Sequence, residues 1–120
     1  MRILVVDDSR AMRMIVLRTL RQSGIEAETL EAEDGADGLA KVHAESPDVI
    51  LSDWNMPNMT GIEFLKALRN EGNNTPFGFV TSESNPQMKI EAIASGSSFF
   101  LTKPFDPDLF KQTVSQVVPA

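Results

Sequence analysis

Short apolar runs alternate with longer amphipathic segments along the whole chain. The runs that favour strands are 3–6, 27–32, 49–52, 77–80 and 99–102. Between the runs, apolar side chains recur at the spacing of a helix face, for example Met12, Ile15, Val16 and Leu20. Alternating strands and helices are typical of βαβ units, whose strands lie parallel in one sheet. The pattern therefore predicts an α/β fold, a three-layer αβα sandwich around a five-stranded parallel sheet with right-handed crossovers.

Residues that cap helices mark where the amphipathic segments begin and end. The signals are Ser9, a capping box of Thr60 with Glu63, Asn85-Pro86 and Asp106-Pro107, with Gly24 and Gly96 at helix ends. The strand at 27–32 is more polar than the others and suggests a sheet edge, whereas 49–52 reads as central. We expect the last two helices to turn these residues inward: Ile90, Ile93, Ala94, Leu109, Phe110, Thr113, Val114, Val117 and Val118.

The composition narrows the possible functions. A chain of 120 residues can bury a real core, so we expect one domain over 1–120. The absence of cysteine excludes disulfides, thiolate metal sites and a cysteine nucleophile. A net charge of −6 argues against direct nucleic-acid binding, which needs basic patches. No apolar run suits a membrane span or a signal peptide, so we expect a cytoplasmic protein without membrane insertion.

Three aspartates follow two of the expected strands. Asp7 and Asp8 close the first strand, and Asp53 comes directly after 49–52. The carboxyl ends of parallel strands meet at the crevice where α/β sheets bind ligands. Carboxylates crowded there repel one another by about 4 kcal/mol per pair at ~4 Å and an effective dielectric of ~20. An all-oxygen site of this kind suits Mg²⁺, Mn²⁺ or Ca²⁺. Thr81 and Lys103 end two further strands, so hydroxyl and ammonium groups should join the carboxylates.

Four segments, each at a strand end, carry a resemblance to a known family. They are Val5-Val6-Asp7-Asp8-Ser9, Asp53-Trp54-Asn55-Met56-Pro57-Asn58-Met59-Thr60-Gly61, Val80-Thr81-Ser82-Glu83 and Leu101-Thr102-Lys103-Pro104-Phe105. Together they resemble the receiver domain of two-component response regulators, and most closely the single-domain chemotaxis regulators of CheY type. The resemblance covers essentially the whole chain and implies the sheet order 2-1-3-4-5.

The resemblance also implies a phosphorylation site. Asp53 would take a phosphoryl group from a phosphohistidine on a sensor histidine kinase or phosphotransfer protein. Asp8, Asp53 and the backbone carbonyl of Asn55 would hold Mg²⁺ (or Mn²⁺), with Asp7 acting largely through a water. Thr81 and Lys103 would each bind a phosphoryl oxygen. The output would be binding to a downstream protein, such as the flagellar motor switch or another effector. The binding surface would be the 85–118 face, which is formed by the helix 85–96, the strand 99–102 and the helix 106–118.

Other positions carry narrower expectations from the same resemblance. Phe100 would be the aromatic switch residue; many relatives have Tyr there, so a hydrogen-bonded form of the switch is not available. Asn55 and Glu83 would set how fast the phosphoryl group is lost, and their identity predicts a short-lived acyl phosphate. Small Ser82 suits phosphoryl access, and Pro104 fits a cis bond after Lys103. We expect Trp54 and Met56 to flank the site. His43, the only histidine, should be a surface residue and not a phosphodonor.

Rival interpretations remain open at the level of sequence. The domain could be part of a longer regulator with an output domain. A phosphatase of the haloacid dehalogenase type needs a second aspartate two residues after the nucleophile, where this chain has Asn55. A flavodoxin-like flavin carrier needs a phosphate loop after the first strand, where Asp7 and Asp8 would repel phosphate. We therefore expect that the protein is not an enzyme acting on other substrates and that it catalyses only its own phosphorylation and dephosphorylation.

Overall fold

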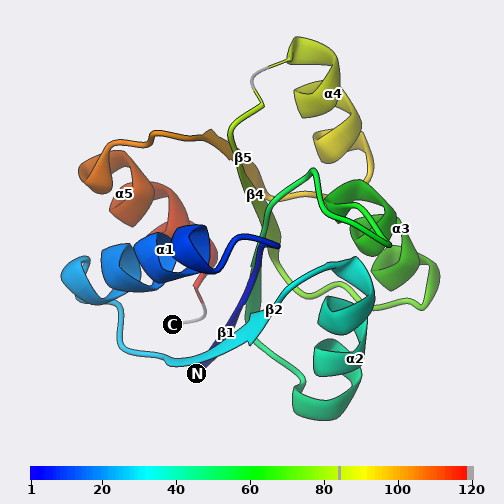
Figure 1. The fold of residues 1–120 in the computed structure, drawn as a ribbon, viewed down its shortest axis with the longest axis horizontal. Coiled ribbons are helices and arrows are strands. Elements are labelled where there is room, and N and C mark those ends of the chain that lie inside the picture. Colours follow the sequence, from blue (N-terminus) through cyan, green and yellow to red (C-terminus); the bar gives the residue numbers. More distant parts are fainter. Residues whose placement is uncertain (84, 119–120) are drawn as a thin grey trace.

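The computed structural model describes residues 1–83 and 85–118. Its parallel sheet has five strands in the order β2-β1-β3-β4-β5, which confirms the expected topology (Figure 1). The strands are β1 Arg2–Val6, β2 Glu28–Ala32, β3 Val49–Ser52, β4 Phe77–Thr81 and β5 Phe99–Thr102. The polar strand β2 lies at one edge, and the buried strand β3 lies in the centre, as predicted.

The helices cover both faces of the sheet, so the fold is the three-layer sandwich that the pattern predicts. They are α1 Arg10–Gln22, α2 Gly35–Glu45, α3 Gly61–Asn70, α4 Pro86–Ala94 and α5 Pro107–Val117. Figure 1 shows α1 and α5 on one side of the sheet, and α2, α3 and α4 on the other. Within the part of the chain that the structure describes, no helix has the length and apolar character needed to cross a membrane.

Two apolar clusters fill the spaces between the layers. Side chains alternate along each strand, so Leu4 of β1 contributes to the cluster under α2 and α3, and Ile3 to the cluster under α1 and α5. The same alternation separates Phe99, in the α1/α5 cluster, from Phe100, which packs at the margin of the other. The two phenylalanines therefore face opposite sides of the sheet.

The capping signals are confirmed at the helix ends. The Thr60 hydroxyl accepts the Glu63 N–H over 3.3 Å, while Glu63 accepts the Thr60 N–H over 2.9 Å, so both halves of the capping box form. Ser9, Asn85 and Asp106 each accept a backbone N–H from the first turn that follows. Each cap fixes where a helix starts relative to the strand before it, and so fixes the loop between them.

The inward face predicted for α4 is wrong. Ile90 and Ile93 are 62% and 56% exposed and Ala94 is also exposed, whereas Ala92 is fully buried and Met88 packs against the core. With 3.6 residues per turn, Ile90 lies about 200° around the helix from Met88, so the two side chains cannot share a face. The helix instead buries the side that carries Met88 and Ala92, which leaves the two isoleucines on the surface.

The predicted faces of α1 and α5 need smaller corrections. In α1 the buried residues are Val16, Thr19 and Leu20, while Ile15 is 43% exposed. In α5 the buried residues are Phe110 and Val114, while Leu109 is 49% exposed. Both exposed residues lie one position from a buried one, at the edge of an apolar stripe wider than the contact it makes.

We predict that Gly78→Ala destabilises the protein. Gly78 lies in β4 against Phe99 of β5, and a Cβ at this position would overlap the Phe99 ring. Overpacking of this kind costs about 1–3 kcal/mol in the free energy of unfolding, which urea denaturation would measure. The double variant Gly78→Ala with Phe99→Leu should lose less than the sum of the two single changes, because the smaller side chain relieves the overlap. Strict additivity would contradict this account.

Candidate functional site

Hydrogen bonds that continue the sheet ladder bring two of the three aspartates side by side. The register pairs Val6 of β1 with Ser52 of β3, so the next residue of each strand reaches the same edge. The Asp53 N–H donates to the Val6 carbonyl over 2.8 Å, and the Asp7 N–H donates to the Ala32 carbonyl over 3.1 Å. The backbone of both residues is therefore fixed by neighbouring strands.

Asp7, Asp8 and Asp53 form one acidic cluster. Each offers a carboxylate oxygen, and these oxygens all lie within 4.8 Å of one another. Asp7 is buried, Asp53 is partly buried and Asp8 is exposed. The structure thus brings together the three carboxylates that the sequence places at strand ends. An all-oxygen donor set with an open side fits a hard divalent cation such as Mg²⁺.

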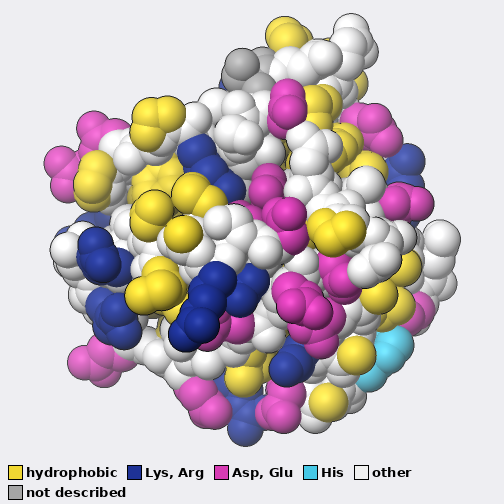
Figure 2. All heavy atoms as spheres, in the orientation of Figure 1, with side chains coloured by type: hydrophobic (Ala, Val, Ile, Leu, Met, Phe, Trp, Pro, Cys, Tyr) yellow, Lys and Arg dark blue, Asp and Glu magenta, His cyan; other side chains and the backbone are white. Residues whose placement is uncertain are grey.

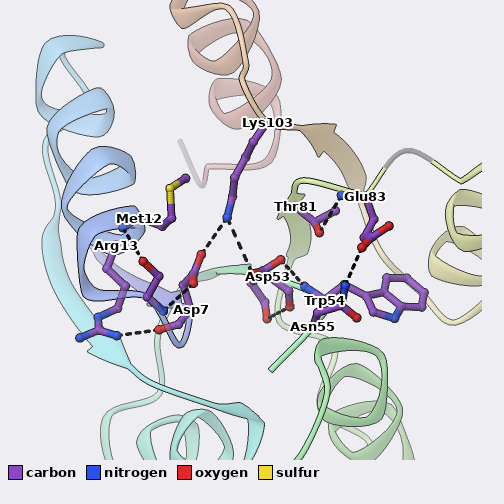
Figure 3. Close-up of polar contacts among 11 residues, drawn as sticks. Asp7, Met12, Arg13, Asp53, Trp54, Asn55, Thr81, Glu83 and Lys103 are labelled. Carbon is purple, nitrogen blue, oxygen red and sulfur yellow. Dashed lines mark hydrogen bonds and ion pairs between the residues drawn. The ribbon is translucent and has the colours of Figure 1, made fainter. Parts of the chain in front are cut away.

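The Lys103 ammonium reaches into this cluster from the end of β5. Its Nζ lies 2.8 Å from Asp7 Oδ2 and 3.8 Å from Asp53 Oδ2, and its side chain is only 10% exposed (Figure 3). The Lys103 N–H donates to the Thr81 carbonyl over 2.7 Å, which ties the lysine to β4. The bond from Lys103 to Pro104 is cis, as expected. The lysine is therefore held as a fixed positive charge between two carboxylates.

The charge of Asp53 is finely balanced. Burial raises the pKa of this carboxyl, the Lys103 ammonium lowers it, and the Asp7 carboxylate raises it again; the net direction is upward. The Trp54 N–H also donates to Asp53 Oδ1 over 2.7 Å, which orients the side chain. A cation bound beside a partly buried carboxylate with a raised pKa stabilises its ionised form, because the cation offsets the cost of desolvation.

The loops after β3 and β4 are joined across the mouth of the site. The side-chain amide of Asn55 donates to Glu83 Oε1 over 2.9 Å, and the Glu83 N–H donates to the Thr81 hydroxyl over 3.3 Å (Figure 3). Thr81 itself is fully buried. The side chains of Asn55 and Glu83 are therefore bonded to each other, and the Glu83 backbone is bonded to the Thr81 hydroxyl.

Phe100 lies where aromatic side chains link the site to α4. Its ring centroid is 6.3 Å from that of Trp54 and 5.9 Å from that of Phe79, and the Lys89 ammonium lies 5.9 Å from its centroid. Trp54 and Met56 are both buried in the core cluster, so they support the loop from beneath.

His43 is exposed and hydrogen-bonded to Glu71, which confirms it as a surface residue.

Sequence reasoning missed two features of the site. The Arg13 guanidinium donates to the Asp7 carbonyl over 2.6 Å and to Glu31 over 3.0 Å, yet nothing in its sequence context distinguishes it from the other arginines of α1. A cavity of about 540 Å³ also extends from the acidic cluster to an apolar wall of Met12, Ile15, Pro104 and Phe105. Figure 2 shows acidic side chains gathered at the centre of this face, with hydrophobic side chains beside them over α1 and α5.

The fold and the site define a class of protein. A doubly wound sheet of order 2-1-3-4-5 with an acidic, lysine-bearing pocket at its carboxyl edge is a flavodoxin-like α/β domain with a site for a cation and an anion together.

Comparison with known proteins identifies the family within that class. The chain belongs to the response regulator receiver domain family, whose model matches residues 3–115. It is 37% identical to the chemotaxis protein CheY of Pseudomonas aeruginosa, over 98% of this chain and 95% of that protein. It is 36% identical to chemotaxis protein CheY1 of Helicobacter pylori, over 98% of this chain and 97% of that protein. A crystal structure of Vibrio cholerae CheY4 matches with a TM-score of 0.86 and 41% identity, over 98% of each chain. Receiver domains are signalling proteins, so membership favours this class over the phosphatase and flavin-carrier alternatives.

The raised pKa of Asp53 leads to a prediction about stability. In a metal-free buffer, ionised Asp53 costs folding free energy, because its pKa is higher in the folded than in the unfolded state. Asp53→Asn removes this cost, so the variant should be more stable than the wild type at pH 7.

The gain should shrink as the pH falls through the folded pKa of Asp53 and vanish below its ordinary value of 3.8, where wild-type Asp53 is protonated in both states. Urea unfolding of both proteins in EDTA between pH 3 and pH 7 would check this. A gain that is independent of pH would show that the carboxylate charge is not its cause.

Proposed function

We propose that this chain is a phosphoacceptor response regulator, acting as one receiver domain over 1–120 in two-component signal transduction. Asp53 takes a phosphoryl group from a phosphohistidine of a sensor histidine kinase or phosphotransfer protein. One observation carries the proposal: the Asp53 carboxylate shares a pocket with two further aspartates and has the Lys103 ammonium 3.8 Å away. Phosphoryl transfer depends mostly on positioning and charge neutralisation, and both are built into this pocket.

The residues present fit Mg²⁺, with Mn²⁺ as an alternative. Asp8, Asp53 and the backbone carbonyl of Asn55 would hold the ion, and Asp7, already paired with Lys103, would act through a water. A bound divalent cation supplies charge neutralisation between the carboxylates and the incoming phosphoryl oxygens.

In the transfer step a carboxylate oxygen of Asp53 forms a bond to phosphorus. The bond between phosphorus and the donor's imidazole nitrogen breaks, and its electron pair stays on that nitrogen. Lys103 pairs with a phosphoryl oxygen, for which a compact ammonium is well suited. The Thr81 hydroxyl accepts the Glu83 N–H and hydrogen-bonds to Asp53, and it turns its hydrogen to another phosphoryl oxygen once Asp53 is phosphorylated.

Phosphorylation then alters binding on the face formed by α4, β5 and α5. Thr81 moves to the phosphoryl group and Phe100 follows inward. The isoleucines that α4 leaves exposed lie on this face and offer apolar contact to a downstream protein. A shift from 1:99 to 99:1 between inactive and active states needs about 5.5 kcal/mol of differential stabilisation.

The chemotaxis relatives support a particular context. We place the protein in the cytoplasm, in a chemotaxis pathway, with the flagellar motor switch or another effector as its target. It catalyses only its own phosphorylation and dephosphorylation. A receiver that forms part of a longer multidomain regulator would use the same chemistry at Asp53 with a different output.

We predict that wild-type protein gains one phosphoryl group when it is incubated with acetyl phosphate and Mg²⁺, and that Asp53→Asn gains none. Intact mass spectrometry measures the gain. Lys103→Ala should slow the reaction by about 10²-fold, the usual cost of removing one stabilising donor. Equal modification of Asp53→Asn, or none of the wild type under any condition, would overturn the proposal.

The hydrogen bond between Asn55 and Glu83 leads to a prediction about the lifetime of the phosphorylated form. Both side chains lie at the mouth of the site, where they can orient a water for attack on phosphorus. Asn55→Ala keeps the backbone carbonyl but removes the amide, and should lengthen the lifetime by about tenfold, less than the ~10²-fold or more of a true general base, because an amide can orient a water but cannot take its proton.

Release of inorganic phosphate from the isolated acyl phosphate would be followed over time. Lys66→Ala is the matched control, because it breaks the exposed hydrogen bond between Lys66 of α3 and Glu91 of α4, which involves no residue of the acidic cluster, and should leave the lifetime unchanged. A shorter lifetime in Asn55→Ala would mean that the amide shields the phosphoryl group instead of assisting its hydrolysis.

A further inference from the structure

The β3–α3 loop, residues 53–60, is fastened to the N-terminus of α2 at two points. The side-chain amide of Asn58 donates to Asp34 Oδ2 over 2.8 Å, and the Gly35 N–H donates to the Met59 carbonyl over 3.1 Å. Asp34 is 7% exposed, and its other oxygen caps α2 by accepting the Asp37 N–H over 2.8 Å. One buried carboxylate therefore joins a helix terminus to the loop that follows Asp53.

Asn58 makes this bond from an uncommon backbone conformation. Its φ is 65°, and the Met59 N–H donates to the Pro57 carbonyl over 2.7 Å, which closes a three-residue γ-turn. Residues other than glycine rarely adopt positive φ, although Asn and Asp do so more readily than most. A turn of this kind persists where its surroundings hold it, and the bond to Asp34 is such a constraint.

Gly35 completes the junction because a larger residue would not fit. A Cβ at this position would lie 2.7 Å from the Met59 carbonyl oxygen and 2.7 Å from its Cγ. The helix terminus and the loop are thus in direct backbone contact. Hydrogen bonds from the Asp37 backbone N–H and from the Asn58 side-chain amide lower the pKa of Asp34. The carboxylate therefore stays ionised and remains an acceptor at neutral pH.

We infer that the Asp34–Asn58 hydrogen bond is a positioning contact for the metal site, because it fixes the backbone at Asn55. This inference rests on the proposed function, in which the Asn55 carbonyl is a Mg²⁺ ligand. The loop is anchored before Asn55 by the Gly61 N–H, which donates to the Trp54 carbonyl over 2.8 Å, and after Asn55 by Asn58. Between the two anchors the position of the carbonyl depends on both, as metal ligands generally depend on the groups that orient them.

The test is Mg²⁺ binding, measured by isothermal titration calorimetry and by fluorescence of Trp54. Trp54 is the only tryptophan in the chain and directly follows Asp53, to which its backbone N–H donates, so we expect its emission to respond to a cation at the site. Asn58→Gly keeps the turn accessible but deletes the amide. We expect it to bind Mg²⁺ about 10-fold more weakly than the wild type, as outer-shell changes commonly do.

A reciprocal exchange separates the contact from general effects of substitution. Asn58→Asp alone sets two carboxylates against one another and should weaken Mg²⁺ binding by about 10-fold, whereas Asp34→Asn alone leaves two amides that can still form a neutral hydrogen bond and should weaken it less. The double variant, Asp34→Asn with Asn58→Asp, restores one donor and one carboxylate at unchanged net charge, and asparagine still caps helices well. We expect it to recover affinity to within about threefold of the wild type, as coupled neighbours do in a double-mutant cycle.

Asn73→Ala is the matched control for lost stability. Asn73 accepts hydrogen bonds from the backbone and hydroxyl of Thr75 in the loop after α3, so its loss should lower the urea midpoint without changing Mg²⁺ affinity. Wild-type affinity in Asn58→Gly, no recovery in the double variant, or an equal loss in Asn73→Ala would each overturn the inference alone. No Mg²⁺ binding by the wild type would overturn the proposed function, and the inference with it.

Discussion

The crowding of three carboxylates at the carboxyl edge of β1 and β3 is the constraint on which the rest of the site depends. Charges this close repel one another strongly in a partly buried setting, and the ammonium of Lys103 is the group that offsets this repulsion in the described structure. The lysine can do so only because β5 ends beside β4, where the Lys103 N–H bonds to the Thr81 carbonyl. The order of strands in the sheet therefore determines which charged side chains meet in the pocket.

The loops that carry Asp7, Asp53 and Asn55 are held by contacts with other elements of the fold. Arg13 of α1 binds the carbonyl of Asp7, Glu83 binds the amide of Asn55, and Asp34 binds Asn58. Each contact joins a loop after one strand to a different element, so the carboxylates and the hydroxyl are set in place before a ligand arrives. Preorganised groups need little rearrangement when charge develops, which is the main source of rate enhancement in sites of this kind.

The sequence predicted the architecture well and the helix faces less well. Strand positions, caps and the acidic cluster followed from local signals: apolar runs, capping residues and aspartates at strand ends. The inward face of α4 was wrong because apolar spacing does not show which of two stripes a helix will bury when one contains a small residue such as Ala92. Arg13 and Asn58 could not be found from sequence, because their partners come from elements distant in the chain.

The side of α4 that is buried also shows how the site can be connected to the surface. Because α4 buries Met88 and Ala92, it leaves Ile90 and Ile93 outward and brings Lys89 over the ring of Phe100. The same ring lies near the ring of Trp54, whose backbone N–H donates to the Asp53 carboxylate. A ligand that moved the loop after β3 would therefore disturb the aromatic packing beneath α4, on the side of the helix opposite the exposed isoleucines. A ligand shifts such an equilibrium only as far as it favours one arrangement over the other, and here the aromatic contacts are where that difference would arise.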